Sequence, residues 1–306
     1  MTENTTAAKM RVLVTGAAGF VGQSQTAILA RRGHAVVAMV HSTPMEESPL
    51  VAVVKGDLRN AASLERALEG CDAVIHLAAA KNDEKISREV NAAGTASLIA
   101  AARKKGARRF IYVSTQSDPR GLYGRTKYEG ERLVRESDMD WTVVKPNVVY
   151  GNDEHGAFMK VARGVMKLPF IPITGPARGK FWPLHVDDCC LAIACCLELN
   201  STIGKTYVLA GRDGVTLPEL VKMIALDLGK PARMIQMPLW FSLLAARILC
   251  VLFPSGSPLS VSNVLGCNQE NVDHDISAMI NELGVEPRSL EDGLREFFSA
   301  QFAAKK

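Results

Sequence analysis

A tyrosine and a lysine four residues apart are the side chains best suited to acid–base chemistry in this chain. Tyr123 and Lys127 lie in the stretch 123–136, which predicts a helix, so both project from one helical face. A free phenol has a pKa of about 10, too high for a base at neutral pH. A nearby ammonium favours the phenolate, so the pair could exchange a proton with a substrate hydroxyl. An incidental pair on a solvated helix face is the alternative.

Three glycines near the start of the chain form a pattern suited to phosphate binding. In VLVTGAAGFVG at 12–22, they lie between a predicted strand and a predicted helix. Gly16 can adopt a tight turn, Gly19 lets the backbone approach a pyrophosphate, and Gly22 lets the helix pack on the strand. The phosphates would rest on the helix N-terminus, where free N–H groups and the helix dipole favour negative charge. A turn that binds no ligand is the alternative. The other residues expected at the phosphates are Ala18, Phe20 and Val21.

The end of the second predicted strand bears on the choice of dinucleotide. An NAD site usually has an acidic residue there to hold the ribose hydroxyls. Here the strand 35–40 is followed by His41, Ser42 and Thr43, without a carboxylate. His41 and Ser42 could face a 2′-phosphate, which favours NADP over NAD. An ordinary loop histidine is the alternative for His41.

Short β-branched segments alternate with amphipathic helical segments through the first half of the chain. This alternation predicts βαβ units and a parallel sheet with ligands at the carboxyl ends of the strands. The Gly- and Pro-rich segment between Pro169 and Pro183 predicts a loop, and the chain from Gly214 onward is expected to be mostly helical. Strands are expected at 11–15, 35–40, 51–55, 73–76, 109–113, 141–145 and 206–209, and helices at 20–32, 61–68, 84–105, 123–136 and 187–199.

A series of motifs in a fixed order resembles the extended and atypical branches of the short-chain dehydrogenase/reductase superfamily, the NAD-dependent epimerase/dehydratase-like proteins. The motifs are TGAAGFVG (15–22), GDL (56–58), IHLAA (75–79), YVSTQS (112–117), YGRTK (123–127), KPNVVYG (145–151) and HVDD (185–188). The resemblance implies an α/β Rossmann fold, a doubly wound parallel sheet with a smaller, mostly helical C-terminal lobe that caps the substrate. It places the NAD(P)-binding core at 8–150 plus 181–212, and the capping lobe at 151–180 and 213–306.

The resemblance also implies roles for individual residues. Tyr123 is the acid/base, Lys127 bonds the nicotinamide ribose, and Thr115 polarises the carbonyl, with Ser114 and Ser117 as weaker candidates. Only eight positions separate Thr115 from Tyr123, fewer than usual in the family, which puts the placement of Thr115 in doubt. Asn91 would support Lys127 through a bound water; a helix N-cap is the alternative. The remaining cofactor residues are Asp57 and Leu58 at the adenine, Leu77, Ala78 and Ala79 on the ribose side, Val113 and Ser114 ending the fifth strand, and Pro146, Asn147 and Val148 beside the nicotinamide.

These roles predict an NAD(P)-dependent oxidoreductase or epimerase/dehydratase that moves a hydride between nicotinamide and a carbinol or ketone carbon. The substrate would be a small molecule, with nucleotide-linked and lipid-linked sugars among the options. The alternative is a non-catalytic NADP(H)-binding accessory or assembly protein, or a redox sensor. The stretch TLPELVKMIALDLGKP at 216–231 and the PLW helix after it are similar to the atypical group containing the nucleotide-binding accessory subunit of respiratory complex I.

Composition excludes several other classes of protein. The net charge is +4 without a run of basic residues, so a nucleic-acid partner is not expected. The seven cysteines include no CxxC pair, and the cluster at 189–196 has the wrong spacing for zinc, so we expect a reduced cytoplasmic protein without a metal. The N-terminus does not have the pattern of a signal peptide. The apolar stretch 238–253 is too short to span a bilayer, and we favour a lobe helix over contact with a membrane surface. A homodimer is compatible with the sequence.

Overall fold

The computed structural model describes residues 9–81, 83–151, 156–252, 264–265, 268 and 273–303, and divides into two compact units. Unit 1 comprises Met1–Pro146, Val186–Leu209 and Asp275–Glu286. Unit 2 comprises Asn147–His185, Ala210–His274 and Pro287–Lys306.

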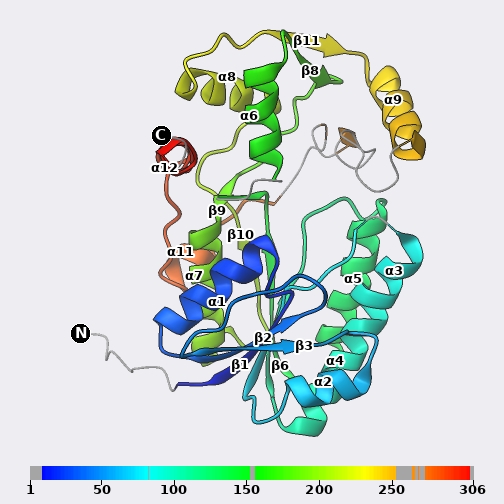
Figure 1. Cartoon of the computed structure of the whole chain (residues 1–306), viewed down its shortest axis with the longest axis vertical. Coiled ribbons are helices and arrows are strands. Elements are labelled where there is room, and N and C mark those ends of the chain that lie inside the picture. Colours follow the sequence, from blue (N-terminus) through cyan, green and yellow to red (C-terminus); the bar gives the residue numbers. More distant parts are fainter. Residues whose placement is uncertain are drawn as a thin grey trace. The chain divides into compact units, whose positions relative to one another are not determined.

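A seven-stranded parallel sheet forms the centre of unit 1, in the order β10-β6-β5-β4-β1-β2-β3 (Figure 1). From β3 to β6 this is the Rossmann order 3-2-1-4-5-6, which reverses direction between β1 and β4, the position at which folds of this kind bind their ligands. The fold class expected from the sequence is confirmed. The strands are β1 Arg11–Thr15, β2 Ala35–Val40, β3 Val51–Lys55, β4 Ala73–His76, β5 Arg109–Val113, β6 Asp140–Pro146 and β10 Thr206–Leu209.

Helices cover both faces of this sheet, which is why its strands are almost continuously apolar. On one face, Leu64, Leu98 and Val134 pack on strand residues such as Leu13 and Phe110. Burial of each such side chain stabilises the folded protein by about 1.5–3 kcal/mol. On the other face α1 packs against α7 (Figure 1). The helical elements of unit 1 are α1 Phe20–Arg31, α2 Ala61–Ala67, α3 Glu84–Arg88, the π-helical turn η1 Glu89–Ala93, α4 Gly94–Lys105, α5 Leu122–Arg135, α7 Val186–Glu198, the short 3-10 turn η2 Asn200–Thr202 and α11 Ser277–Asn281.

Unit 2 has a separate core in which helices pack around a stacked aromatic pair. The rings of Tyr150 and Phe158 lie 4.7 Å apart, among apolar side chains of α6, α8 and α12. The described elements of unit 2 are β7 Val149–Tyr150, α6 Ala157–Lys167, β8 Ile171–Thr174, β9 Leu184–His185, α8 Leu217–Asp227, β11 Met234–Met237, α9 Leu239–Leu252 and α12 Leu290–Ala303.

Two expectations for this part of the chain need correction. The segment between Pro169 and Pro183 is not wholly a loop, because Ile171–Thr174 forms β8. β8 pairs in parallel with β11, which lies in a part expected to be mostly helical. Both strands are four residues long, and Pro172 interrupts the pattern of β8, so neither carries a clear strand signal. Among the described residues, no helix has the length and apolarity needed to cross a bilayer.

Candidate functional site

The turn between β1 and α1 requires glycine at two positions. Gly16 has φ +70°, and a Cβ there would lie 2.8 Å from the backbone nitrogen of Ala78. At Gly22 a Cβ would lie only 2.1 Å from the carbonyl oxygen of Gly16. Gly16 therefore permits the turn and its contact with the segment after β4, and Gly22 permits the close approach of α1.

The N-terminus of α1 is free of competing negative charge. Gly19 is the N-cap, and the first turn has no acidic residue and no side-chain cap. The backbone N–H groups of Phe20 and Val21 have no carbonyl acceptor within the helix, as in the first turn of every α-helix. The side chain of Gln23 donates to the carbonyl of Ala18 (2.9 Å), which fixes the loop before the helix. This helix start could hold a phosphate.

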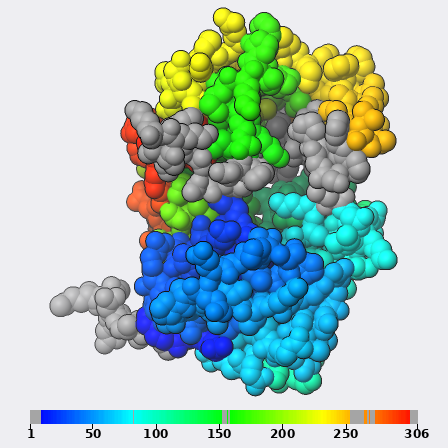
Figure 2. Space-filling model, viewed as in Figure 1, coloured from blue at the N-terminus to red at the C-terminus, as the bar shows by residue number. Residues whose placement is uncertain are grey.

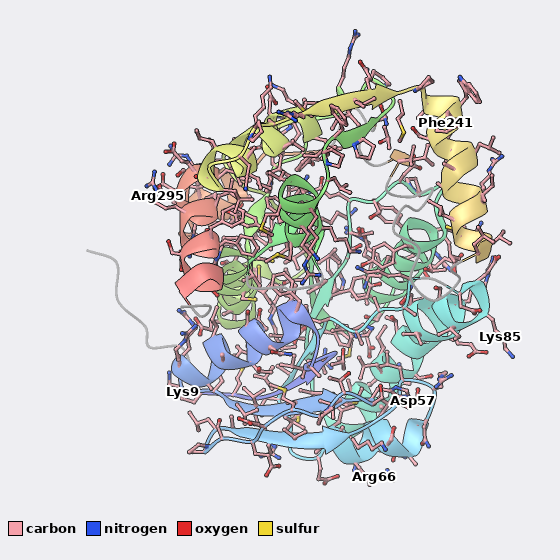
Figure 3. The ribbon with its side chains drawn as sticks, turned by 45° about the horizontal axis from the view of Figure 1, so that its top comes forward. Lys9, Asp57, Arg66, Lys85, Phe241 and Arg295 are labelled. Atoms are coloured by element: carbon pink, nitrogen blue, oxygen red, sulfur yellow. The ribbon has the colours of Figure 1, made fainter. Side chains whose placement is uncertain are left out.

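Three charged or titratable side chains gather after β2 and β3. The Nε2 atom of His41 lies 3.3 Å from Oδ2 of Asp57, and Nη2 of Arg59 donates to the same oxygen at 2.7 Å. The Arg59 hydrogen bonds hold the pKa of Asp57 well below its usual range. Ser42 is exposed and Leu58 is buried. The structure thus brings Asp57 next to His41 (Asp57 is labelled in Figure 3) and adds Arg59, which our sequence reasoning did not single out.

A chain of buried polar side chains joins β1, β4 and η1. The Thr95 hydroxyl donates to the carbonyl of Asn91 (2.8 Å), so it accepts from Nε2 of His76 (3.0 Å). Nδ1 of His76 then accepts from the Thr15 hydroxyl at 2.7 Å. Burial, and to a smaller extent Lys127, lowers the pKa of His76 well below its usual value, so the ring is neutral. This chain fixes the end of β4, from which the half-buried Leu77 and Ala78 and the exposed Ala79 follow.

Asn91 holds the loop that follows β4. Its side chain accepts from the amide of Ala80 and donates to the carbonyl of Ala80, both at 2.8 Å. It also donates to the Thr126 hydroxyl at 2.9 Å, which ties α5 to the same loop. The N-cap alternative for Asn91 is wrong, because the residue lies in η1, inside a continuous helical stretch from Glu84 to Lys105. Its expected water-mediated support of Lys127 stays a prediction.

Lys127 is the most unusual charged residue in the described part of the chain. It is 1% exposed, and its Nζ has no hydrogen-bond partner among the described residues. The atom lies 4.2 Å from the ring centroid of Tyr112, which offers a cation–π contact. Burial lowers the pKa of Lys127 to about 7; Glu131 opposes this change and Lys81 adds to it. A buried donor without an acceptor points to a missing ligand.

Tyr123 lies one helical turn before Lys127, also on α5. Burial raises the pKa of its phenol to about 12. The lowering expected from the neighbouring ammonium is therefore absent without a cofactor, and the phenol is protonated at neutral pH. Our sequence reasoning missed Lys81, whose Nζ lies 5.1 Å from the Tyr123 ring centroid. The only signal for it is its position just after the IHLAA motif.

The three candidate hydroxyls near the end of β5 have different partners. The hydroxyl of Ser114 donates to the Glu131 carboxylate at 2.6 Å, so its proton is not free to polarise a carbonyl. The Thr115 hydroxyl donates to Ser117 Oγ (2.9 Å) and accepts from the Ser117 amide (3.0 Å). The short loop that follows turns back onto α5, where a Cβ at Gly124 would meet the Asp118 carbonyl at 2.3 Å. The structure therefore pairs Thr115 with Ser117, and among the described residues no hydrogen bond joins Thr115 to Tyr123.

Glu131 is a third residue that our sequence reasoning missed, after Arg59 and Lys81. Its carboxylate is buried, and burial alone would raise its pKa, but hydrogen bonds from Ser114, Arg135 and Lys145 lower it below the usual value. Lys145, on β6, lies 3.0 Å from Glu131 Oε1. Spacing contained a hint, because Glu131 is four residues after Lys127 on the same helix.

The last predicted cofactor residues fall on both sides of the unit boundary. Val113 ends β5 and Pro146 ends β6, both in unit 1. Asn147 and Val148 belong to unit 2, where Asn147 Oδ1 accepts from the amides of Val148 (2.8 Å) and Trp182 (3.1 Å).

Within unit 1, the residues present fit a nicotinamide dinucleotide. A helix start free of acidic groups suits the pyrophosphate, and the turn before it excludes any Cβ at Gly16 and Gly22. Further along the sheet edge, the unpartnered Nζ of Lys127 suits a ribose hydroxyl as acceptor. A model of the NAD dependent epimerase/dehydratase family matches residues 12–210. The chain belongs to this family.

Several known proteins are similar to much of the chain. UDP-glucose 4-epimerase of Vibrio cholerae is 26% identical over 321 residues, which cover 93% of each chain. The mitochondrial NADH dehydrogenase [ubiquinone] 1 alpha subcomplex subunit 9 of Dictyostelium discoideum is 32% identical over 223 residues, 69% of this chain and 62% of that protein. The crystal structure of dTDP-glucose 4,6-dehydratase from Streptomyces venezuelae, with NAD and TYD bound, has a TM-score of 0.76 at 22% identity, covering 97% and 98% of the two chains. Both resemblances expected from the sequence, to the family and to the complex I subunit, are confirmed.

Proposed function

We propose that this epimerase/dehydratase-family protein is a working oxidoreductase, in which Tyr123 exchanges a proton with a substrate oxygen while a hydride moves between nicotinamide and the carbon that bears that oxygen. The observation that carries the proposal is the buried, unpartnered Nζ of Lys127 one helical turn after Tyr123. A buried ammonium without an acceptor destabilises the folded protein, and a ligand that accepts its hydrogen bond offsets this loss of stability.

The protonation states favour proton donation as the first role of Tyr123. With a pKa raised to about 12 by burial, the phenol carries its proton at neutral pH. It can therefore protonate a carbonyl oxygen as hydride reaches the carbonyl carbon, so that a ketone becomes a carbinol. The reverse reaction needs a lower phenol pKa, for which the charged Lys127 and an oxidised, positively charged nicotinamide are both suited. If the same dinucleotide stays bound through both directions, the net reaction is epimerisation or dehydration.

We also propose that the dinucleotide is NADP and that the substrate is a nucleotide-linked sugar. His41 and Arg59 place two cationic or titratable groups after β2 and β3, and the Asp57 charge is already paired with Arg59. A 2′-phosphate would meet no unpaired carboxylate there. The substrate class is supported by the names of the Vibrio cholerae and Streptomyces venezuelae proteins, which act on UDP-glucose and dTDP-glucose.

The test compares two tyrosines of α5. Tyr123→Phe should lower the oxidation of UDP-glucose or dTDP-glucose deuterated at its ring carbinol carbons, followed through transfer of deuterium to NADP⁺ or NAD⁺, by about 10²–10⁴-fold. The dissociation constant of each dinucleotide, from fluorescence titration, should change little. Tyr128→Phe is the matched control, since Tyr128 is the next tyrosine of the helix and lies over Lys145. Equal turnover in the two variants would rule out Tyr123 as the acid/base, and tighter binding of NADH than of NADPH would rule out the NADP preference.

A second candidate is a dinucleotide-binding accessory protein without turnover. Two observations favour it: the similarity to the complex I subunit and the engagement of the Thr115 hydroxyl with Ser117. This candidate predicts that both dinucleotides bind while neither sugar nucleotide exchanges deuterium with them. Transfer that depends on Tyr123 would refute it.

A further inference from the structure

Helix α9 of unit 2 turns its large apolar side chains outward. Trp240 is 68% exposed and Val251 81% exposed, although the helix contains a single charged residue, Arg247. At 100° per residue, the exposed large side chains other than Leu239 fall within one third of the helix circumference. We call this surface the α9 face; its residues are Trp240, Phe241, Leu244, Ile248, Val251 and Leu252.

The opposite side of α9 packs inward with small residues. Ser242 and Ala246 are fully buried and lie four residues apart. The Ser242 hydroxyl donates to the Pro238 carbonyl at 3.1 Å, which satisfies its only donor. This orientation is the reverse of an ordinary surface helix, which buries its large apolar side chains. Figure 2 shows α9, in gold and orange, at the molecular surface, and Figure 3 labels Phe241 in its first turn. Contiguous exposed apolar residues of this kind mark interaction surfaces.

Two segments of the chain, one of which contains α9, have basic residues and no acidic ones. Residues 155–186 and 228–269 contain no Asp or Glu. They contain eight Lys and Arg residues, each exposed in the structure: Lys160, Arg163, Lys167, Arg178, Lys180, Lys230, Arg233 and Arg247. For a chain whose net charge is only +4, this is a strong local imbalance.

The small sheet β8–β11 connects part of this charge to α9. The amide of Ile171 donates to the carbonyl of Arg233 (2.8 Å), which places Arg233 beside Phe170 at the start of both strands. Phe170 and Leu168 are about half exposed, next to Lys167 at the end of α6. β11 ends at Met237, and α9 begins two residues later. Exposed apolar and cationic side chains therefore alternate along one continuous part of unit 2.

We propose that the α9 face docks on the surface of an anionic lipid bilayer, with its aromatic and aliphatic side chains in the interface and the neighbouring cations at the headgroups. Trp and Phe on one face, with Lys and Arg beside it, are typical of interfacial helices. The helix lies on the bilayer, since no described helix is long enough to cross it. The sequence alone favoured a lobe helix because α9 itself has only Arg247. The pairing of β8 with β11 adds Arg233 and, at the end of α6, Lys167 next to the segment that leads into α9.

Charge also distinguishes a membrane from a second copy of the chain. In a twofold dimer the same patch meets itself, so Arg233 and Lys230 would face cations of the partner. An anionic bilayer offers the opposite charge instead. The proposal therefore commits to lipid and makes self-association an outcome of the test.

The test is flotation of the full chain with phosphatidylcholine vesicles that contain or lack phosphatidylglycerol. The unaltered chain should float with the anionic vesicles and be released by high salt. Phe241→Ser with Leu244→Ser should reduce the partition coefficient by about tenfold or more. Lys230→Glu with Arg233→Glu should reduce binding by about tenfold at low salt. Leu199→Ser with Ile203→Ser, which removes two exposed aliphatic side chains from unit 1, is the matched control and should float like the unaltered chain.

Dinucleotide titration and circular dichroism of each variant show whether it is folded before the vesicles are added. Absence of flotation with anionic vesicles would overturn the proposal. Equal flotation of the Phe241→Ser, Leu244→Ser variant and the unaltered chain would do the same. Light scattering that shows a dimer dissociated by the α9 substitutions, without lipid, would assign the α9 face to self-association instead.

Discussion

Replacing Lys127 by methionine should stabilise the protein in the absence of dinucleotide. Methionine is also unbranched and flexible, is one heavy atom shorter than lysine, and removes the charge from a position that is 1% exposed. Burial takes the lysine pKa from 10.5 to about 7. At about 1.4 kcal/mol per pH unit, this corresponds to a cost of up to about 5 kcal/mol for the buried ammonium. Methionine avoids that cost and fills most of the same space.

The pH dependence of this effect has a definite sign. Below about pH 7 the lysine is protonated in both the folded and the unfolded chain, so the full cost is present. Between about 7 and 10.5 the folded chain has lost this proton and the unfolded chain still holds it, so the free energy of unfolding of the unaltered protein rises with pH. The advantage of Lys127→Met should therefore fall from up to about 5 kcal/mol near pH 6 to about 2 kcal/mol near pH 9.

Urea unfolding followed by circular dichroism at the two pH values measures this difference. Lys85→Met is the control, since Lys85 is an exposed lysine on α3 (labelled in Figure 3) and its replacement should shift stability little at either pH. The reasoning is refuted if Lys127→Met is less stable than the unaltered protein near pH 6, or if the difference between them is the same at both pH values. The variant should also bind the dinucleotide more weakly, because it cannot donate to the ribose.

Two further substitutions test the parts of the site that hold the cofactor and the catalytic helix. Gly22→Ala should lower the free energy of unfolding by about 3 kcal/mol or more and weaken dinucleotide binding, because its Cβ would lie 2.1 Å from the Gly16 carbonyl oxygen. Gly164→Ala is the control: a Cβ there meets nothing within 4 Å, so melting temperature and dinucleotide binding should be unchanged or stability slightly higher. Similar losses in the two variants would contradict the argument. Glu131→Gln should cost about 3 kcal/mol near neutral pH, measured by urea unfolding, because Arg135 and Lys145 lose their buried partner. Since the folded pKa of Glu131 lies below 4.5, that difference should be present above about pH 4.5 and shrink as the pH falls further; a difference that grows on acidification would refute the assignment, and Glu129→Gln on the same helix is the control.

Local signals in the sequence were sufficient to predict the parallel sheet and the glycine-rich turn between β1 and α1. Gly16 and Gly22 lie between a strongly apolar strand and a clear helix, and the alternation that follows leaves one parallel arrangement. In unit 2 the sequence did not reveal β8 or β11, because four residues are too few to show a strand periodicity and Pro172 interrupts the pattern of β8. Their pairing depends on segments about sixty residues apart.

Partners of individual polar groups were harder to predict than their positions. The sequence placed Ser114, Thr115 and Ser117 together, but only the fold shows that Ser114 donates to Glu131 and that Thr115 is paired with Ser117. Lys81 reaches Tyr123 from the loop after β4, a contact between distant segments that no spacing rule encodes. The same is true of Asn91, whose side chain bonds Ala80 because η1 departs from regular α-helical winding.

The π-helical turn η1 contains one residue more than a regular α-helix would have at this place. A chain shortened by one position within 89–93 could wind regularly from Glu84 to Lys105, with better backbone hydrogen bonds than the native helix has. Asn91 would then swing about 100° around the axis and release both the loop at Ala80 and the anchor at Thr126. The helix would become regular, but the loop after β4 would lose its hydrogen bonds to Asn91. The irregular turn therefore makes the helix less regular and holds in place the loop that follows β4.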